Sequence, residues 1–229
     1  MRILKVAAPL AAGVLAGWSG IAVAGAQPAC TDLGGTVDAG VCQVRSSNPR
    51  YTLDLRFPLN YPDEQALTDY LVQNRDGFIN VAQMPGSHDL PYEMDATGDA
   101  YHSGRPPRGT QSVVLKIFQD IGGAHPVTWY KAFNYDLGQR RALTFDNLFA
   151  PGTKPLDVIF PIVARELEKQ TGLTGAVLPG DGLDPTHYQN FAVTDDELIF
   201  FFGQGELLPS DAGATVARVP RSAIPPLQV

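Results

Sequence analysis

The sequence predicts a single domain of the α+β class, in which strands and helices are segregated along the chain. Several short segments alternate apolar and polar residues, as a half-buried strand does. Only two segments, 62–83 and 155–172, repeat apolar residues with the spacing of a long amphipathic helix. No linker rich in proline and glycine divides the chain into two cores. Together these observations predict one sheet-containing domain with two main helices.

Residues 1–26 have the layout of a secretory signal peptide. A positively charged start precedes apolar residues 6–18, and residues 24–26 read Ala-Gly-Ala, a small-x-small cleavage motif. The apolar run is shorter than the roughly 18 residues of a membrane span. We therefore expect cleavage after residue 26 and an exported mature domain, 27–229, with no stable membrane span. An uncleaved anchor is the alternative.

The charge balance predicts an acidic mature protein. The whole chain has 17 lysines and arginines against 24 aspartates and glutamates, and two of the basic residues lie in the signal segment. The mature chain thus has 15 basic and 24 acidic residues, a net charge of −9. Such a surface repels phosphates and anionic lipid heads, so we expect no nucleic-acid partner.

Cys30 and Cys42 are the only cysteines. An exported chain meets oxidising conditions, in which two cysteines form a disulfide. Closing this short loop is worth about 3 kcal/mol in the chain-entropy model. Metal ligation and a reactive thiol are the alternatives, but no CxxC or His-Cys spacing supports either. We predict the Cys30–Cys42 disulfide.

The first half of the mature chain predicts one helix among strands. Residues 51–59 alternate as a half-buried strand, and residues 62–83 follow as a helix with acidic groups in its first turn. The segment after it is broken by proline, glycine and serine, with one possible strand at 92–97. Residues 112–120 and 127–137 flank IGGAHP and predict two antiparallel strands with a tight connection.

The second half predicts a helix followed by strands. Thr144 can cap a short helical turn, and the helix 155–172 ends at a glycine. A further short turn begins at Asp184-Pro185 and carries His187. Residues 190–203 predict a hairpin turned at TDDE, whose second strand is continuously apolar and therefore buried, and 214–224 supply the last strand.

His125 is the first candidate for a catalytic side chain, in the segment GGAHP. A residue before proline is held extended, and the neighbouring glycines permit a close turn. This placement fits a general base at a loop tip, and it equally fits a residue that only shapes the turn. The residues alone favour the structural interpretation.

Ser87 and His88 are the other candidates, because Ser87-His88-Asp89 contains the three residue types of a hydrolase triad. Adjacent side chains diverge, whereas a triad needs a chain of two hydrogen bonds, so any catalytic partner has to come from elsewhere. The nucleophile elbow GxSxG is absent. Three further serines are possible nucleophiles only because nothing in the sequence excludes them: Ser103, Ser112 and Ser210.

Motifs for metals and cofactors are missing, and we expect neither. His102, His125 and His187 are isolated, with no HExxH pattern and no short cluster of histidine and acidic residues. The phosphate-binding patterns GxGxxG and GxxxxGK[ST] do not occur. The segment GQGEL, which contains Glu206, predicts a sharp exit from a buried strand.

Several long blocks resemble a known family, the mycobacterial secreted immunogenic antigens of the MPT-sixty-four type. The resemblance runs from about Cys30 to Ile224, and GELLPS is among the blocks most similar to a paralogue described as a cell-wall carboxylesterase. The wider group is the RsiV family, whose pattern is carried here by KAFN and TFDNLF. The main blocks are PPRGTQSVVLK, GGAHPVTWYKAFNYD, FPIVARELEKQTG and LDPTHYQNFAVTDDELIFFF.

The resemblance implies a β-grasp-like fold with a mixed or antiparallel sheet, and two possible functions. The first is an exported cell-wall or secreted protein that binds an envelope or host protein, as a monomer. The alternative is a carboxylesterase that cleaves short acyl esters through an atypical serine, with His125 or His88 as base. RsiV-type anti-sigma factors carry a cytoplasmic segment before a membrane span, and here the apolar stretch begins at residue 6, so we expect no anti-sigma role.

Overall fold

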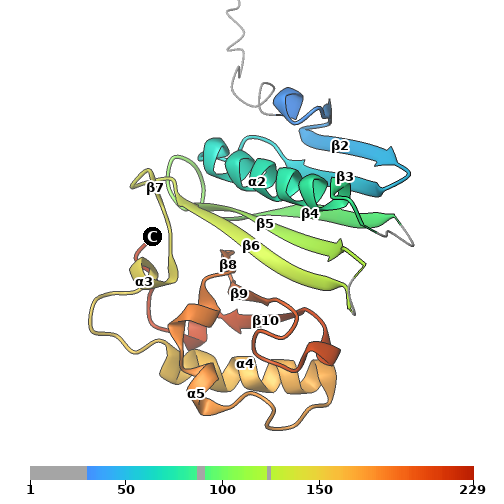
Figure 1. Ribbon diagram of the computed structural model, residues 1–229. Helices are drawn as coiled ribbons and strands as arrows, with labels where there is room; N and C mark the ends of the chain where they lie inside the picture. The colour runs from blue at the N-terminus through green and yellow to red at the C-terminus, as the bar shows by residue number, and fades with distance from the viewer. Residues whose placement is uncertain (1–29, 87–90, 123–124) are drawn as a thin grey trace, which may run out of the picture.

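The protein is built in four layers, shown in Figure 1. The computed structural model describes residues 30–86, 91–122 and 125–229. Helix α2 covers one face of a seven-stranded sheet, a three-stranded sheet packs on the opposite face, and helix α4 covers the outside of the smaller sheet. The two interfaces between helix and sheet hold most of the core, and a small apolar cluster joins the two sheets.

The large sheet is mixed. Its order follows the sequence from β1 to β7, and every neighbouring pair is antiparallel except β3 and β4. The parallel pair needs a crossover, and α2 provides it. The strands are β1 (Thr36–Asp38), β2 (Val41–Asn48), β3 (Tyr51–Pro58), β4 (Tyr92–Ser103), β5 (Thr110–Asp120), β6 (Val127–Asp136) and β7 (Arg141–Ala142).

Helix α2 (Glu64–Gln83) begins two residues after the predicted start at residue 62, and Asp63 is its N-cap instead of a member of its first turn. The side chain of Asp63 accepts a hydrogen bond from the backbone N–H of Ala66 at 3.3 Å, which satisfies one of the free donors of the first turn. Its buried face packs on the large sheet beside residues of β3, β4 and β5. That face consists of Leu67, Leu71, Phe78 and Ala82.

The three-stranded sheet explains the continuous apolar run near the C-terminus. Its strands are β8 (Phe191–Val193), β9 (Glu197–Phe202) and β10 (Thr215–Pro220), with β9 in the centre and all pairs antiparallel. Phe200 and Phe202 of β9 face helix α4, whereas Ile199 and Phe201 face the large sheet. A central strand buried on both faces needs no polar side.

Helix α4 (Leu156–Thr171) and several short helices complete the outer layer. Gly172 ends α4 in the left-handed conformation with φ of 73°, as a helix C-cap glycine does. Within the described residues, no helix combines the length and the hydrophobicity that crossing a lipid bilayer requires. The short helices are α3 (Phe145–Leu148), α5 (Pro179–Gly182), η1 (Pro185–Tyr188), η2 (Ser210–Ala212) and η3 (Arg221–Ala223).

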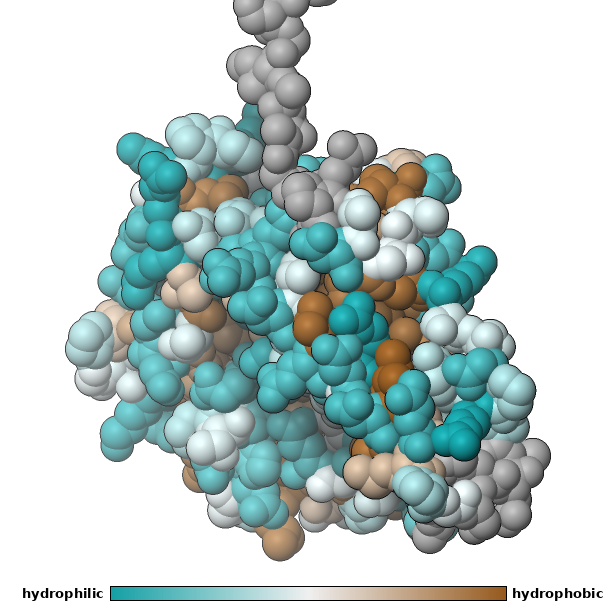
Figure 2. Space-filling view, turned by 45° about the horizontal axis from the view of Figure 1, so that its top comes forward, coloured by the Kyte–Doolittle hydropathy of each residue, from teal (hydrophilic) through white to brown (hydrophobic). Residues whose placement is uncertain are grey.

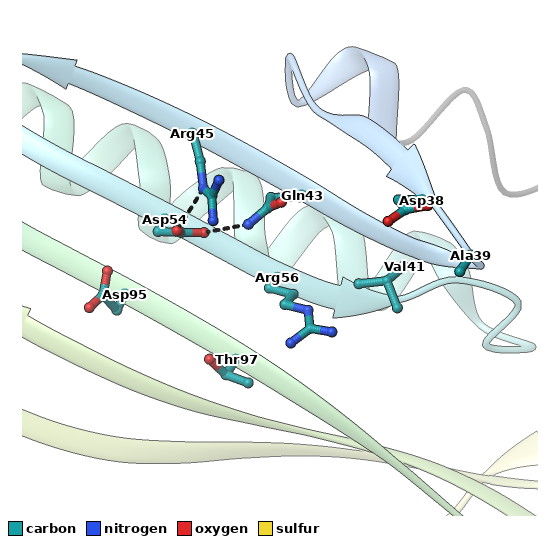
Figure 3. A pocket seen from close by; sticks show the side chains of 9 residues that line it. All are labelled: Asp38, Ala39, Val41, Gln43, Arg45, Asp54, Arg56, Asp95 and Thr97. Carbon is teal, nitrogen blue, oxygen red and sulfur yellow. Dashed lines mark hydrogen bonds and ion pairs between the residues drawn. The ribbon is translucent and has the colours of Figure 1, made fainter.

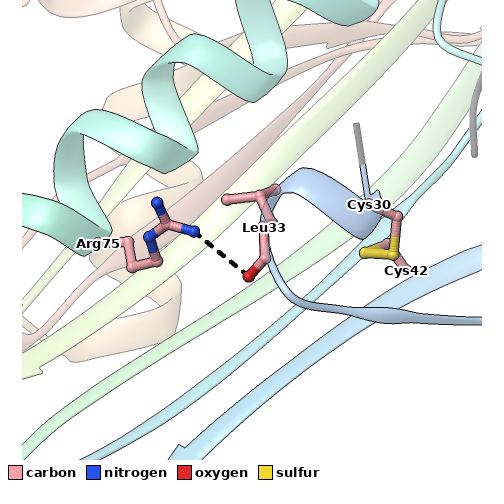
Figure 4. Close-up of a disulfide and its surroundings, with 4 residues drawn as sticks. All are labelled: Cys30, Leu33, Cys42 and Arg75. Atoms are coloured by element: carbon pink, nitrogen blue, oxygen red, sulfur yellow. Dashed lines mark hydrogen bonds between the residues drawn. A yellow bond between two sulfur atoms is a disulfide. The ribbon is translucent and has the colours of Figure 1, made fainter. Parts of the chain in front are cut away.

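The predicted disulfide is present and fully buried (Figure 4). Cys30 and Cys42 lie 5.6 Å apart at Cα, and both are 0% exposed. A Cβ on Gly35 would come within 2.8 Å of both sulfur atoms, so the chain can pass this point only with a glycine. Arg75 of α2 donates to the carbonyl oxygen of Leu33 at 3.3 Å. The start of the domain is thereby joined both to β2 and to α2.

The predicted α+β class, the mixed sheet and the two long helices are confirmed, with three differences in detail. The hairpin of β1 and β2 lies before the first predicted strand, and its polar end RSSN hides the alternation. Strand β4 continues to Ser103, whereas the sequence predicts a strand that ends at Thr97. The prediction stops early because the second half of the strand is mostly exposed and polar. The last three strands form a sheet of their own rather than extending the first.

Candidate functional site

The residues that the sequence singles out are not brought together in the described part of the chain. Ser87 and His88 lie outside the described residues. His125 lies on the connection between β5 and β6 and is exposed. Among the described residues it has no hydrogen-bond or ion-pair partner. A catalytic role for these three side chains stays a prediction.

His187 is held instead in a defined position. It belongs to η1, whose first turn is capped by Asp184: that carboxylate accepts from the N–H and the hydroxyl of Thr186 at 2.9 and 2.7 Å. The next residue, Tyr188, is fully buried and donates its hydroxyl to the carbonyl of Gly182 at 2.7 Å. Because Tyr188 points into the core, the short helix is anchored and His187 is left 26% exposed.

Glu206 is the partner of His187. The carboxylate oxygen Oε2 accepts the N–H of Gly203 at 2.7 Å, and Oε1 lies 4.0 Å from Nδ1 of His187. Burial raises the pKa of Glu206 above its ordinary 4.5, while the Gly203 N–H and the nearby His187 act in the opposite direction. A carboxylate on the Nδ1 side leaves Nε2 facing away from it, as in a hydrolase triad, but the 4.0 Å contact is an ion-pair distance and longer than the hydrogen bond of a triad.

Ser210 lies in the same loop as Glu206. A Cβ on Gly205 would lie 2.9 Å from the Ser210 hydroxyl oxygen, so this serine packs directly over the residue next to Glu206. Ser210 is exposed, at the start of η2. The other two serines that the sequence leaves as possible nucleophiles are buried: Ser103 is 4% exposed and Ser112 is 0% exposed. Burial prevents both from meeting a diffusing ester.

The sequence shows each part of this arrangement but not their meeting. Asp184-Pro185 predicts the cap that orients His187, and GQGEL predicts the sharp strand exit that carries Glu206. The two side chains are 19 positions apart and meet because the β8–β9 hairpin folds the chain back between them. Within the residues described, no group of three or more histidines, cysteines and acids could hold a metal ion.

The pH dependence of stability tests the environment of Glu206. The carboxyl pKa is higher in the folded chain than in the unfolded chain, so the folded state binds this proton more tightly. The contribution of Glu206 to stability is therefore fully present below pH 4.5 and is lost as the pH rises through the folded-state pKa. We expect Glu206→Gln to reduce the loss of Tm between pH 4 and pH 7.

The control for this measurement is Asp69→Asn, which changes the same charge at an exposed position of α2. Thermal melts of the three proteins across the pH range give the comparison. A Glu206→Gln profile that is parallel to that of the unchanged protein contradicts the buried environment of this carboxyl group.

Two known proteins are similar to this chain over almost the whole length of both partners in each comparison. It is 63% identical over 230 residues to Esterase Rv3036c of Mycobacterium tuberculosis strain H37Rv, and the match covers 100% of both chains. It is 48% identical over 224 residues to Immunogenic protein MPT64 of the same strain, with 98% of each chain covered. The chain belongs to the family of these two proteins. The resemblance to the immunogenic antigens is thus confirmed.

The chain also matches a second described family and a solved structure. Residues 146–222, from α3 to η3, match the family described as "Protein of unknown function (DUF3298)". A crystal structure of a DUF3298 family member from Bacteroides fragilis superposes with a TM-score of 0.51 at 12% identity, over 82% of this chain and 92% of that chain. At this identity the likeness concerns the fold alone.

Proposed function

We propose that the chain is an exported hydrolase of short acyl esters in which Ser210 is the nucleophile, His187 the general base and Glu206 the orienting carboxylate. The observation that carries the proposal is the geometry of His187. Its Nδ1 faces a carboxylate that is itself held by the Gly203 N–H, and within the described residues its Nε2 has no hydrogen-bond or ion-pair partner. The loop that supplies the carboxylate also supplies an exposed serine.

Each residue has one role in the proposed reaction. The Ser210 oxygen attacks the ester carbonyl carbon while His187 Nε2 takes the hydroxyl proton. The imidazolium returns that proton to the leaving alcohol as the carbon–oxygen bond of the ester breaks, which leaves an acyl-serine. Water then attacks the acyl group with His187 again acting as base, and the acid and free Ser210 result. The Glu206 carboxylate stabilises the imidazolium and holds its orientation.

The comparisons support this proposal. A relative that is identical at 63% of positions along its whole length is named an esterase. Export is part of the proposal, with cleavage after residue 26 as the sequence predicts. Intact mass spectrometry of the native material tests this step, because retention of residues 1–26 would contradict it.

Active-site labelling identifies the nucleophile. The purified mature protein should hydrolyse p-nitrophenyl butyrate faster than an unrelated acidic protein of the same purity, and a fluorophosphonate probe should abolish this activity. Trypsin releases residues 170–218 as one peptide, in which Ser210 is the only serine. We expect the label on this peptide. A label mapped to Ser87 within peptide 76–108, which also contains Ser103, would instead support the prediction from the sequence. Absence of both hydrolysis and label would refute the hydrolase.

A non-catalytic binding role is the second candidate function. It is supported by the relatives at 48% identity, which are named only as immunogenic proteins. In this case His187 and Glu206 only stabilise the loop, and a surface elsewhere on the domain contacts an envelope or host molecule. An inert protein in the labelling experiment that still binds a ligand saturably would favour this role.

A further inference from the structure

The face of the large sheet opposite α2, here called its outer face, is only partly covered by the small sheet. Strand β8 packs over β4, β5 and β6, and helix α2 lies behind the sheet. Over β1 to β3 and the first half of β4 the face opposite α2 is therefore open, and side chains of these strands line a hollow of about 530 Å³ (Figure 3). Its walls are polar and charged: Asp38, Gln43, Arg45, Asp54, Arg56, Asp95 and Thr97 line it together with Ala39 and Val41.

Charges of both signs lie close together in this hollow. Arg45 is paired with Asp54 at 2.9 Å, and Gln43 contacts the same carboxylate at 3.5 Å. Arg56 points to the same side of the sheet but, among the described residues, makes no ion pair or hydrogen bond. An exposed guanidinium without a partner keeps five N–H groups free for a ligand.

A second hollow continues the first. It has about 330 Å³ and lies where the large sheet passes beneath β10 and α4. Thr97 of the first hollow is the direct pairing partner of Lys116, and Lys116 is that of Tyr130; both line the second hollow. The two hollows therefore share a border. The row from Gln43 on β2 to Tyr130 on β6 crosses four strand spacings, about 19 Å.

The far end of this row is aromatic. Tyr130 and Tyr101 flank Phe201 with ring centroids 5.3 and 5.8 Å apart, and Phe201 forms part of the floor. Lys116, which lies between this end and Thr97, is exposed and has no ion-pair partner in the described chain. The groove thus combines two cations that have no ion-pair partner among the described residues, several acidic side chains and an aromatic end on one continuous face.

We infer that this groove binds a linear, hydroxyl-rich glycan laid across β2 to β6. Arginine side chains only donate hydrogen bonds and ionised aspartates only accept them, whereas a hydroxyl group does both. A chain of hydroxyl groups therefore matches a hollow in which Arg56 lies beside a row that contains Asp54 and Asp95. The aromatic end offers a surface for the apolar face of a sugar ring. The ligand is expected to be neutral, since charges of both signs line the groove.

Other ligand classes match the groove less well. A peptide that extends a sheet needs an unpaired strand edge, and β2, β3 and β4 are paired on both sides. A nucleic acid needs a surplus of cations, and here aspartates accompany the arginines. An apolar partner needs an apolar patch, whereas the lining of the first hollow is mostly polar and charged. The different face of the molecule that Figure 2 shows is also largely hydrophilic.

The test is a titration of the ¹⁵N-labelled mature protein with three neutral linear tetrasaccharides: cellotetraose, chitotetraose and a linear arabinan fragment. We expect saturable amide shifts for at least one of them, confined to the outer-face positions of β2 to β6. Absence of shifts with all three, or shifts that map elsewhere, would overturn the inference. These probes contain no ester bond. The outcome of the titration is therefore independent of the hydrolase proposal.

Two variants connect the binding to the named side chains. Arg56→Ala removes a charged donor and should raise Kd at least about tenfold. Thr97→Val keeps the shape and removes one hydroxyl group, and should raise Kd by a smaller factor while the fold is retained. Lys154→Ala removes the same charge from an exposed position before α4 and should leave Kd unchanged. Equal Kd values for Arg56→Ala and Lys154→Ala would also overturn the inference.

Discussion

Replacing His187 by alanine should lower kcat/KM for p-nitrophenyl butyrate at least about a hundredfold, the usual contribution of a general base. The side chain of His187 lies on a short helix that is held by the buried Tyr188 and by the cap at Asp184. Its removal should therefore leave the fold intact. Ser210→Ala should lose activity to a similar degree, because the proposed nucleophile is gone. Steady-state kinetics with circular dichroism of the same samples provide the measurement.

The other histidines supply the controls for this experiment. His102 is exposed on β4, and its replacement by alanine should leave kcat/KM unchanged. His125→Ala examines the base that the sequence predicts. Loss of activity in His125→Ala together with retention in His187→Ala would contradict the site proposed from the structure and support the one predicted from the sequence.

Removing the disulfide should have the largest effect on stability. The double variant Cys30→Ala/Cys42→Ala opens a loop closed by cysteines 12 positions apart, which costs about 3 kcal/mol of unfolding free energy in the chain-entropy model. The loss also frees the segment around Gly35, which packs on the two sulfur atoms. Urea unfolding followed by fluorescence gives the difference between the two proteins.

Burial of the sulfur atoms provides the control. Both cysteines are 0% exposed, so a reducing agent added to the folded protein should leave the bond intact and the spectrum unchanged. Reduction of the unfolded chain should instead shift the refolding midpoint to that of the double variant. An identical urea midpoint for the double variant and the unchanged protein would show that this bond contributes nothing to stability.

The parts of the fold that the sequence predicted are those governed by local rules. Helices α2 and α4 follow from apolar spacing, the end of α4 at Gly172 from the conformation of a C-cap glycine, and the β8–β9 hairpin from a polar turn between apolar runs. Strand β4 was predicted too short because exposed strand residues leave no alternation to detect. The β1–β2 hairpin was missed for the same reason.

The candidate site was less accessible from the sequence. Ser87, His88 and His125 drew attention because of their neighbours in the chain, but neighbours in sequence say little about side chains that meet in space. His187 and Glu206 were each interpreted as parts of turns, which they are, and their contact depends on how β8 and β9 pair. The outer-face row through Arg56 depends in the same way on strand register.

The amino-acid sequence alone determined the α+β class, the two long helices, the disulfide partners and the resemblance to the immunogenic antigens. These properties depend on local periodicity, on a single possible cysteine pair, or on long matching blocks. Only the tertiary structure decided that the strands divide into two sheets, that Glu206 faces His187, and that an open polar groove runs across β2 to β6. Contacts between distant segments are set by register and packing, and neither is expressed in the spacing of residues along the chain.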